Sequence, residues 1–88
     1  MAFAFIVTRE QFQVRSELEV AHLPTGAVFR AYPYSDPRDL LQSIRVNWGR
    51  AGAPVDGEYS EQIRRVASQL LLERARRAAA DRRLGYVA

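Results

Sequence analysis

The clearest pattern in the chain is an alternation of apolar and polar side chains over residues 11–22. One side carries Phe12, Val14, Leu18 and Val20, and the other carries Gln11, Gln13, Arg15, Glu17 and Glu19. A period of two predicts a β-strand with one wet face. A strand of this length would span roughly 40 Å, more than the roughly 30 Å width of so small a domain. We therefore expect the strand to bend or break at Arg15 and Ser16.

Two further strands are predicted beside this segment. Residues 3–8 are aromatic and β-branched, which is typical of a strand. Residues 27–33 form another, reached through a turn made by Leu23, Pro24, Thr25 and Gly26. The pattern predicts a three-stranded antiparallel meander. In it, residues 3–8 pair with the first half of 11–22, and residues 27–33 pair with the second half.

A short helix and a loop follow the predicted sheet. Asp36 is a suitable N-cap and Pro37 a suitable first helical residue, so we expect a helix over about 37–45. Residues 46–58 contain three glycines and a proline, which predicts a loop. Within it, Val46 to Trp48 could add a brief extra strand.

The last predicted element is a long helix over 61–83, capped by Ser60. Its apolar stripe has helical spacing and consists of Ile63, Val66, Ala67, Leu70 and Leu71. Farther along, the same side carries Arg74 and Arg77, and arginine is seldom buried unpaired. We expect the helix to leave the core near Glu73, so that residues 74–88 form a projecting or frayed end.

The elements together predict one α+β domain over residues 1–88: a three-stranded antiparallel β-meander, then a short helix, then a long C-terminal amphipathic helix packed on one face of the sheet. A hydrophobic fraction of 48% in 88 residues fits a globular domain with a modest core. The absence of cysteine excludes disulfides, thiolate nucleophiles and zinc–cysteine sites. The sequence contains neither a targeting segment nor an apolar run of spanning length, so we expect a cytoplasmic protein without a membrane partner.

The basic charge is concentrated on the long helix. All 13 basic side chains are arginine; residues 60–83 hold seven of them against three acids, or +4, and the rest of the chain holds six against seven, or −1. Three interpretations follow. The arginines could be a solvated end that complements the helix dipole, with Glu61–Arg65 and Glu73–Arg77 as i,i+4 pairs. They could form a protein-binding or self-association surface together with Leu72, or they could contact a phosphate backbone.

A search for catalytic chemistry finds little. His22 is the one histidine, and neither a metal-ligand pattern nor a nucleophile or phosphate-binding motif accompanies it. We therefore predict no metal, no cofactor, no catalytic residue and no enzymatic activity. A metal-independent ribonuclease stays as a third hypothesis, with acid–base and cationic roles for His22, Arg30, Tyr32 and Tyr34.

The function predicted from the sequence is a small, non-catalytic interaction or regulatory module that binds another protein or a second copy of itself. Its size and character match a small phage or mobile-element inhibitor, for example an anti-CRISPR protein, although no motif carries that analogy. Nucleic-acid binding through the arginine-rich helix is the alternative. Trp48 either fills the base of the core, which we favour, or anchors a partner. The candidate partner-binding residues are Trp48, Arg50, Leu72, Arg74, Arg76, Arg77, Arg82 and Arg83.

Overall fold

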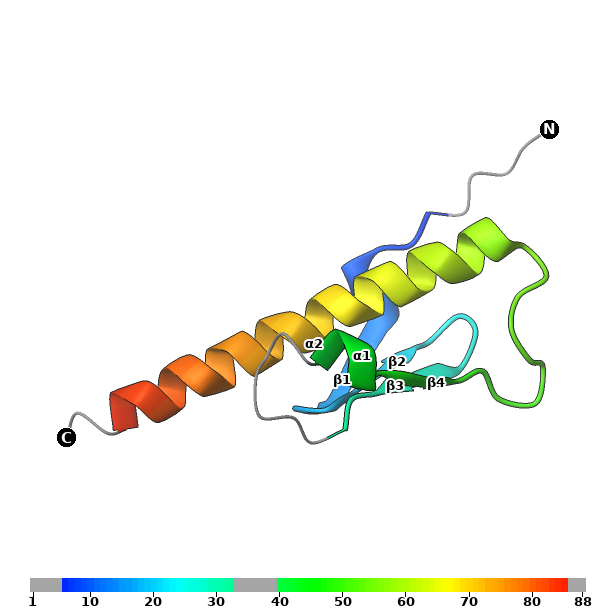
Figure 1. Ribbon diagram of the computed structural model, residues 1–88. Helices are drawn as coiled ribbons and strands as arrows, with labels where there is room; N and C mark the ends of the chain where they lie inside the picture. The colour runs from blue at the N-terminus through cyan, green and yellow to red at the C-terminus, as the bar shows by residue number, and fades with distance from the viewer. Residues whose placement is uncertain (1–5, 33–39, 86–88) are drawn as a thin grey trace.

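The computed structural model describes residues 6–32 and 40–85, with Leu41 and residues 81–85 described as backbone only. The described elements are a 3-10 turn η1 (Arg9–Gln11), strands β1 (Phe12–Ser16), β2 (Glu19–His22) and β3 (Ala27–Arg30), helix α1 (Leu40–Ser43), strand β4 (Arg45–Asn47) and helix α2 (Gly57–Gly85). The strands form one antiparallel sheet in the order β1-β2-β3-β4. Figure 1 shows α2 lying across one face of this sheet, as expected for the predicted α+β class.

The alternating segment forms a hairpin of two strands. The break expected at Arg15 and Ser16 is confirmed, because the register of β1 with β2 shifts between Val14 and Ser16. The predicted pairing of the first half with residues 3–8 is wrong, because the first half pairs with the second half. The predicted pairing of the second half with residues 27–33 is confirmed, because β2 pairs with β3. The Ser16 hydroxyl oxygen accepts a hydrogen bond from the Leu18 backbone N–H over 3.2 Å, which closes the turn between the strands. Antiparallel strands need only a two-residue connection, so this local pairing is the shortest available.

The prediction of a strand over residues 3–8 is wrong for residues 6–8, the part of this segment that the structure describes. Residues 6–8 have no regular structure, and residues 9–11 form η1, in which the Gln11 N–H donates to the Thr8 carbonyl over 3.2 Å. The segment contacts α2 instead of adding a strand to the sheet. Val7 packs against the core, and the Arg9 guanidinium pairs with the Glu73 carboxylate, with Nη1 2.8 Å from Oε1. These contacts with the helix replace the hydrogen bonds that a strand would make. Residues 1–5 lie outside the described part.

The sheet has four described strands where three were predicted. The brief extra strand expected at Val46 to Trp48 is present one residue earlier, as β4, and β4 pairs with β3. β3 itself ends at Arg30, before the predicted end at residue 33. The short helix is confirmed over Leu40–Ser43, where the Ser43 hydroxyl donates to the Leu40 carbonyl over 2.8 Å. The proposed cap residues Asp36 and Pro37 lie outside the described residues.

Helix α2 begins three residues before the predicted N-cap Ser60. Asp56 Oδ1 accepts hydrogen bonds from the Glu58 N–H over 2.9 Å and the Tyr59 N–H over 3.2 Å, so Asp56 is the N-cap. Ser60 lies inside the first turn, where its hydroxyl donates to the Gly57 carbonyl over 2.9 Å. The prediction chose the wrong cap because Gly57 and Glu58 looked like loop residues in the sequence.

The hydrophobic core fills the space between the sheet and α2. The buried residues of the core are Phe12, Val20, Ala27, Phe29, Ala31, Leu40, Ile63, Ala67, Leu70, Leu71 and Ala75. The predicted stripe of α2 therefore faces the sheet, and it reaches Ala75, two residues beyond the expected exit at Glu73. From there the helix continues to Gly85, past the edge of the sheet (Figure 1).

Candidate functional site

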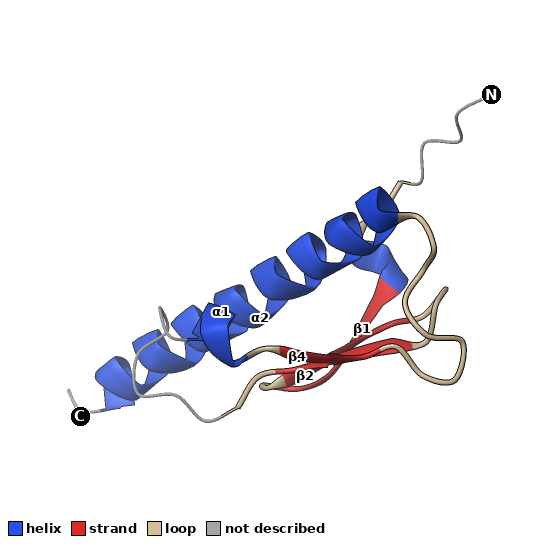
Figure 2. Cartoon of the chain, turned by 45° about the vertical axis from the view of Figure 1, so that its right-hand side comes forward, coloured by secondary structure: helices blue, strands red, loops and turns tan. Residues whose placement is uncertain are grey.

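The two faces of the sheet have opposite characters. On the face covered by α2, Val20 lies opposite Phe29 and both are buried. On the other face, Arg30 lies between Glu19 of β2 and Arg45 of β4 in the register. Figure 2 shows that none of the described elements covers this second face, which we call the open face. Alternation along each strand directs successive side chains to opposite faces.

A cross-strand row at one end of the open face, which we call the arginine row, consists of Glu19 at the start of β2, Arg30 at the end of β3 and Arg45 at the start of β4. Arg30 and Arg45 are directly opposed on β3 and β4. The Arg30 Nη1 lies 3.5 Å from Glu19 Oε1, whereas the Arg45 Nη1 contacts the backbone carbonyl oxygens of Gln42 and Ile44 at 3.3 Å each. Like charges directly opposite each other in a sheet are destabilising. We therefore expect the Arg30–Arg45 pair to cost stability, a cost that the contact of Arg30 with Glu19 offsets in part.

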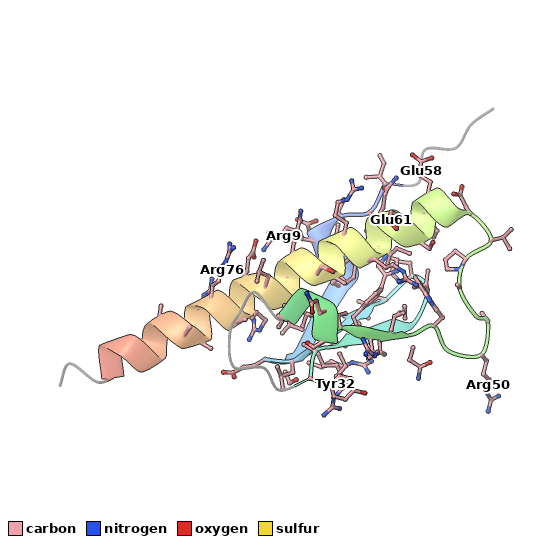
Figure 3. The ribbon with its side chains drawn as sticks, in the orientation of Figure 1. Arg9, Tyr32, Arg50, Glu58, Glu61 and Arg76 are labelled. Carbon is pink, nitrogen blue, oxygen red and sulfur yellow. The ribbon has the colours of Figure 1, made fainter. Side chains whose placement is uncertain are left out.

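A groove of about 420 Å³ runs over this row. Its lining consists of Arg15, Glu19, Val28, Arg30, Tyr32, Arg45, Val46 and Asn47. Three arginines against one glutamate leave +2 on the lining. Tyr32 is half exposed, and Figure 3 shows it on the side of the sheet away from α2. Guanidinium groups bind carboxylates or phosphates in a bidentate manner. Val28 and the tyrosine ring add apolar contact, whereas Val46 lies opposite Phe29 and packs against the core. This arrangement suits an anionic partner.

His22 lies on the opposite face and has a structural role. Its side chain is fully buried, with Nδ1 2.8 Å from the Thr25 hydroxyl and Nε2 2.9 Å from Gln11 Oε1. An amide oxygen only accepts, so Nε2 carries the proton and Nδ1 accepts from Thr25. Burial lowers the pKa of His22 below its usual value, which favours this neutral form. The ring thereby joins η1, β2 and the turn after β2.

The arrangement required by the ribonuclease hypothesis is not assembled in the described chain. His22 is buried on the face of the sheet that α2 covers, whereas Arg30 and Tyr32 are exposed on the open face. A histidine that is fully buried and hydrogen-bonded through both nitrogens cannot reach a phosphate held by those two side chains. Tyr34, the fourth member, lies outside the described residues.

Trp48 packs inward, in agreement with the interpretation that it fills the base of the core. It is partly buried against the core, with its ring edge-to-face to Phe29 at a centroid distance of 5.8 Å. The Arg64 guanidinium of α2 lies 5.7 Å from the centre of the indole ring on which it stacks. Arg50 is exposed in the loop two residues later (Figure 3). The two residues therefore do not form a common contact surface.

The other predicted residues lie on α2 in different environments. Leu72 is partly buried against the core, so it is less free than its position among polar residues suggested. Arg74 is half-buried, and its Nε is buried without an acceptor among the described atoms. Arg76 and Arg77 are exposed. The side chains of Arg82 and Arg83 lie outside the described set. Figure 3 shows Arg50 in the loop before α2 and Arg76 far from it along α2, so the predicted residues do not gather into one site.

Sequence analysis missed the arginine row. Glu19 of the row and Arg15 in the groove lining do occupy the polar side of the alternating segment. The juxtaposition of Arg30 with Arg45 depends on the pairing of β3 with β4, which periodicity does not specify. Within the described ranges, no group of three or more histidine or acidic side chains could hold a metal ion. Nor does any helix in them have the length and apolarity required to cross a membrane.

Comparison with known proteins finds no matching family model, no matching curated protein and no matching solved structure.

Proposed function

We propose that the protein is a non-catalytic interaction module that holds an acidic segment of another protein on its open face. The observation that carries the proposal is the direct opposition of Arg30 and Arg45. A carboxylate placed between two guanidinium groups converts their repulsion into two charge-assisted contacts. Local arrangements that cost stability are expected at functional sites, where binding compensates for them. A module that acts only by occupying its partner's surface would regulate or inhibit that partner.

An acidic peptide fits the row better than a polynucleotide does. Glu19 contacts Arg30 within the lining, so the positive surface is interrupted by a carboxylate. A nucleic-acid strand presents a phosphate at every nucleotide and would place one close to Glu19. A peptide can place a neutral or basic side chain there and its acidic side chains over Arg30 and Arg45. The partly exposed Val28 gives such a peptide an apolar contact as well.

Binding of a labelled peptide tests the proposal. The probe is a twelve-residue peptide of alternating glutamate and valine, followed by fluorescence anisotropy at low salt. We expect Arg30→Gln and Arg45→Gln each to weaken binding about tenfold, the loss of one charge-assisted contact of about 1.4 kcal/mol. The matched control is Arg50→Gln, which removes the same charge from an exposed loop far from the row and should leave binding unchanged. Absence of binding by the natural protein, or equal weakening by Arg50→Gln, would refute the proposal.

Nucleic-acid binding through α2 is the second candidate, and the exposure of Arg76 and Arg77 favours it. A single-stranded RNA of mixed sequence should then bind with an affinity that falls steeply with salt. Arg76→Gln and Arg77→Gln should weaken RNA binding, and Arg45→Gln should not. If Arg45→Gln weakened RNA binding and the two helix variants did not, RNA would bind to the open face. RNA, and not an acidic peptide, would then be the ligand of that face.

A further inference from the structure

The outward side of α2 is divided into an acidic half and a basic half. Glu58 and Glu61 are exposed near its beginning and Arg76 is exposed in its second half. Glu58 and Arg76 are 76 − 58 = 18 residues apart, about five turns of 3.6 residues, so they share one side of the helix. Figure 3 shows all three on the side of α2 away from the sheet. Among the described residues, none of the three has an ion-pair partner.

A hollow accompanies the acidic half. It has a volume of about 290 Å³ and is lined by Val7, Glu58, Glu61, Gln62, Arg65 and Val66. Two valines supply an apolar wall, and two carboxylates against Arg65 leave a net charge of −1 on the lining. An arginine side chain needs both, because its aliphatic stem packs on apolar surface while its guanidinium group binds carboxylates. The hollow therefore has the chemistry to receive an arginine.

The chain itself carries a suitable arginine at the right place for symmetric pairing. Consider two α2 helices that run antiparallel about a two-fold axis. Each interface residue then faces a residue of the other copy, and the residue numbers of every facing pair add up to the same sum. Setting Glu61 against Arg76 of the second copy fixes this sum at 61 + 76 = 137. The same register sets Arg65 against Leu72, since 65 + 72 = 137. It also places Ser68 and Gln69 at the axis.

Each of these contacts is chemically favourable. Glu61 with Arg76 is an ion pair that the symmetry makes twice, once at each end of the interface. The stem of Arg65 can cover the partly exposed Leu72 of the other copy. Ser68 and Gln69 are polar residues able to hydrogen-bond across the axis. The helix dipole alone explains acidic residues near the start of a helix and basic residues near its end. It does not explain the hollow, nor that the register which pairs Glu61 with Arg76 also sets the stem of Arg65 against Leu72.

We propose that the protein forms a symmetric homodimer through the outward side of α2, with Arg76 of each copy seated against Glu58 and Glu61 of the other. The occupant of this surface is a second copy of the chain because the chain supplies the complementary charge in the complementary order. The open face lies on the far side of the sheet from this surface. The dimer therefore leaves the arginine row accessible, and the proposal stands independently of the proposed function.

Charge exchange between two variants tests the dimer. Sedimentation equilibrium at low salt should show a dimer of the natural chain. Glu61→Arg alone and Arg76→Glu alone should each raise the dimer dissociation constant at least tenfold, because like charges then meet at both ends. An equimolar mixture of the two variants should restore a one-to-one dimer. In the mixed pair, the two substituted side chains meet at one end with their charges exchanged, and the natural Arg76 meets the natural Glu61 at the other.

The controls separate this result from unfolding and from other binding modes. Both substitutions are at exposed positions, so circular dichroism should show unchanged helix content and melting temperature. Arg50→Glu makes the same change of charge as Arg76→Glu in the exposed loop and should leave the dimer intact. A natural chain that stays monomeric at low salt, or a mixture that stays monomeric, would overturn the proposal, and so would assemblies larger than a dimer in the mixture. Peptide binding by Glu61→Arg should equal that of the natural chain, so the two proposals can fail separately.

Discussion

The two faces of the sheet are made by the same strands, but one is apolar and buried and the other is charged and exposed. At neighbouring positions of β3, Phe29 is fully buried under α2 while Arg30 is exposed opposite a second arginine. The helix side excludes water and holds the apolar contacts that stabilise the fold. The open face places two like charges in opposed positions, which we expect to lower stability. The surface that stabilises the fold and the surface that we propose for binding are therefore separated by a single residue step along a strand.

Removing a large side chain from the helix side should have the largest effect. Phe29→Ala is expected to cost about 3–5 kcal/mol, because it removes a fully buried ring and leaves a cavity. A loss of that size would unfold a domain with little stability to spare. Thermal unfolding followed by circular dichroism measures it. Val28→Ala, the neighbour on the open face, is the control and should cost less than about 1 kcal/mol. Equal losses would erase the distinction between the faces.

Removing His22 should have the next largest effect. His22→Ala leaves Gln11 and Thr25 without their buried partner, which should cost about 1–3 kcal/mol in the free energy of unfolding. Urea denaturation measures this loss. Tyr32→Ala, which removes a larger ring from the open face, should cost less. A greater loss for Tyr32→Ala would mean that the open face carries more of the stability than we infer.

The pH dependence of stability should report the burial of His22. Its folded pKa is lowered from the ordinary value of 6.5, so the unfolded chain takes up a proton first as the pH falls. Stability should be complete above about pH 6.5 and should decline below it, by at most about 1.4 kcal/mol per pH unit, until the folded pKa is reached. Urea denaturation between pH 7.5 and pH 5 measures the slope. His22→Gln should abolish it, and a slope unchanged by this substitution would assign the titration to another group.

Relieving the arginine row should have a small effect of opposite sign. Arg45→Gln removes the charge opposite Arg30 and should raise stability by about 0.2–1 kcal/mol at low salt. The gain should shrink in high salt, where the repulsion is screened. Melting temperatures of this variant and of the control Arg50→Gln, at both salt concentrations, measure it. A destabilised Arg45→Gln would show that the row stabilises the fold and would weaken the argument for a binding role.

The smallest effect is expected at the exposed contact between Arg9 and Glu73. Glu73→Gln breaks the ion pair, yet both side chains face solvent, so the melting temperature should change less than for any variant above. The hydrogen bond from Arg9 lowers the pKa of Glu73. Any contribution of the pair is therefore present above about pH 4.5 and is lost as the pH falls through the lowered pKa. A double-mutant cycle with Arg9→Gln isolates the pair. A coupling as large as the loss for His22→Ala would show that this contact holds the N-terminal segment in place.

Much of the secondary structure followed from local patterns in the sequence. The break in the alternating segment, the apolar stripe of α2, the short helix and the brief strand β4 were all expected within a few residues. The cap of α2 was misplaced because the hydrogen bonds of Asp56 are visible only in three dimensions. Of the candidate site, only the exposure of individual residues was predictable. Arg30 and Arg45 are 45 − 30 = 15 residues apart in the sequence. No local sequence pattern indicates that their two strands pair.

The sequence by itself determined which side chains share a face within each element, because side-chain direction follows a period of two in strands and 3.6 in helices. It also determined the basic charge of α2 and the absence of cysteine chemistry. Only the tertiary structure decided which strand edges pair, and it placed β1 against β2 while η1 packs on α2. Pairing depends on competition among all available edges and surfaces, which no single segment contains. For the same reason, only the folded chain brought Arg30 to Arg45 and left that row on the face that α2 does not cover.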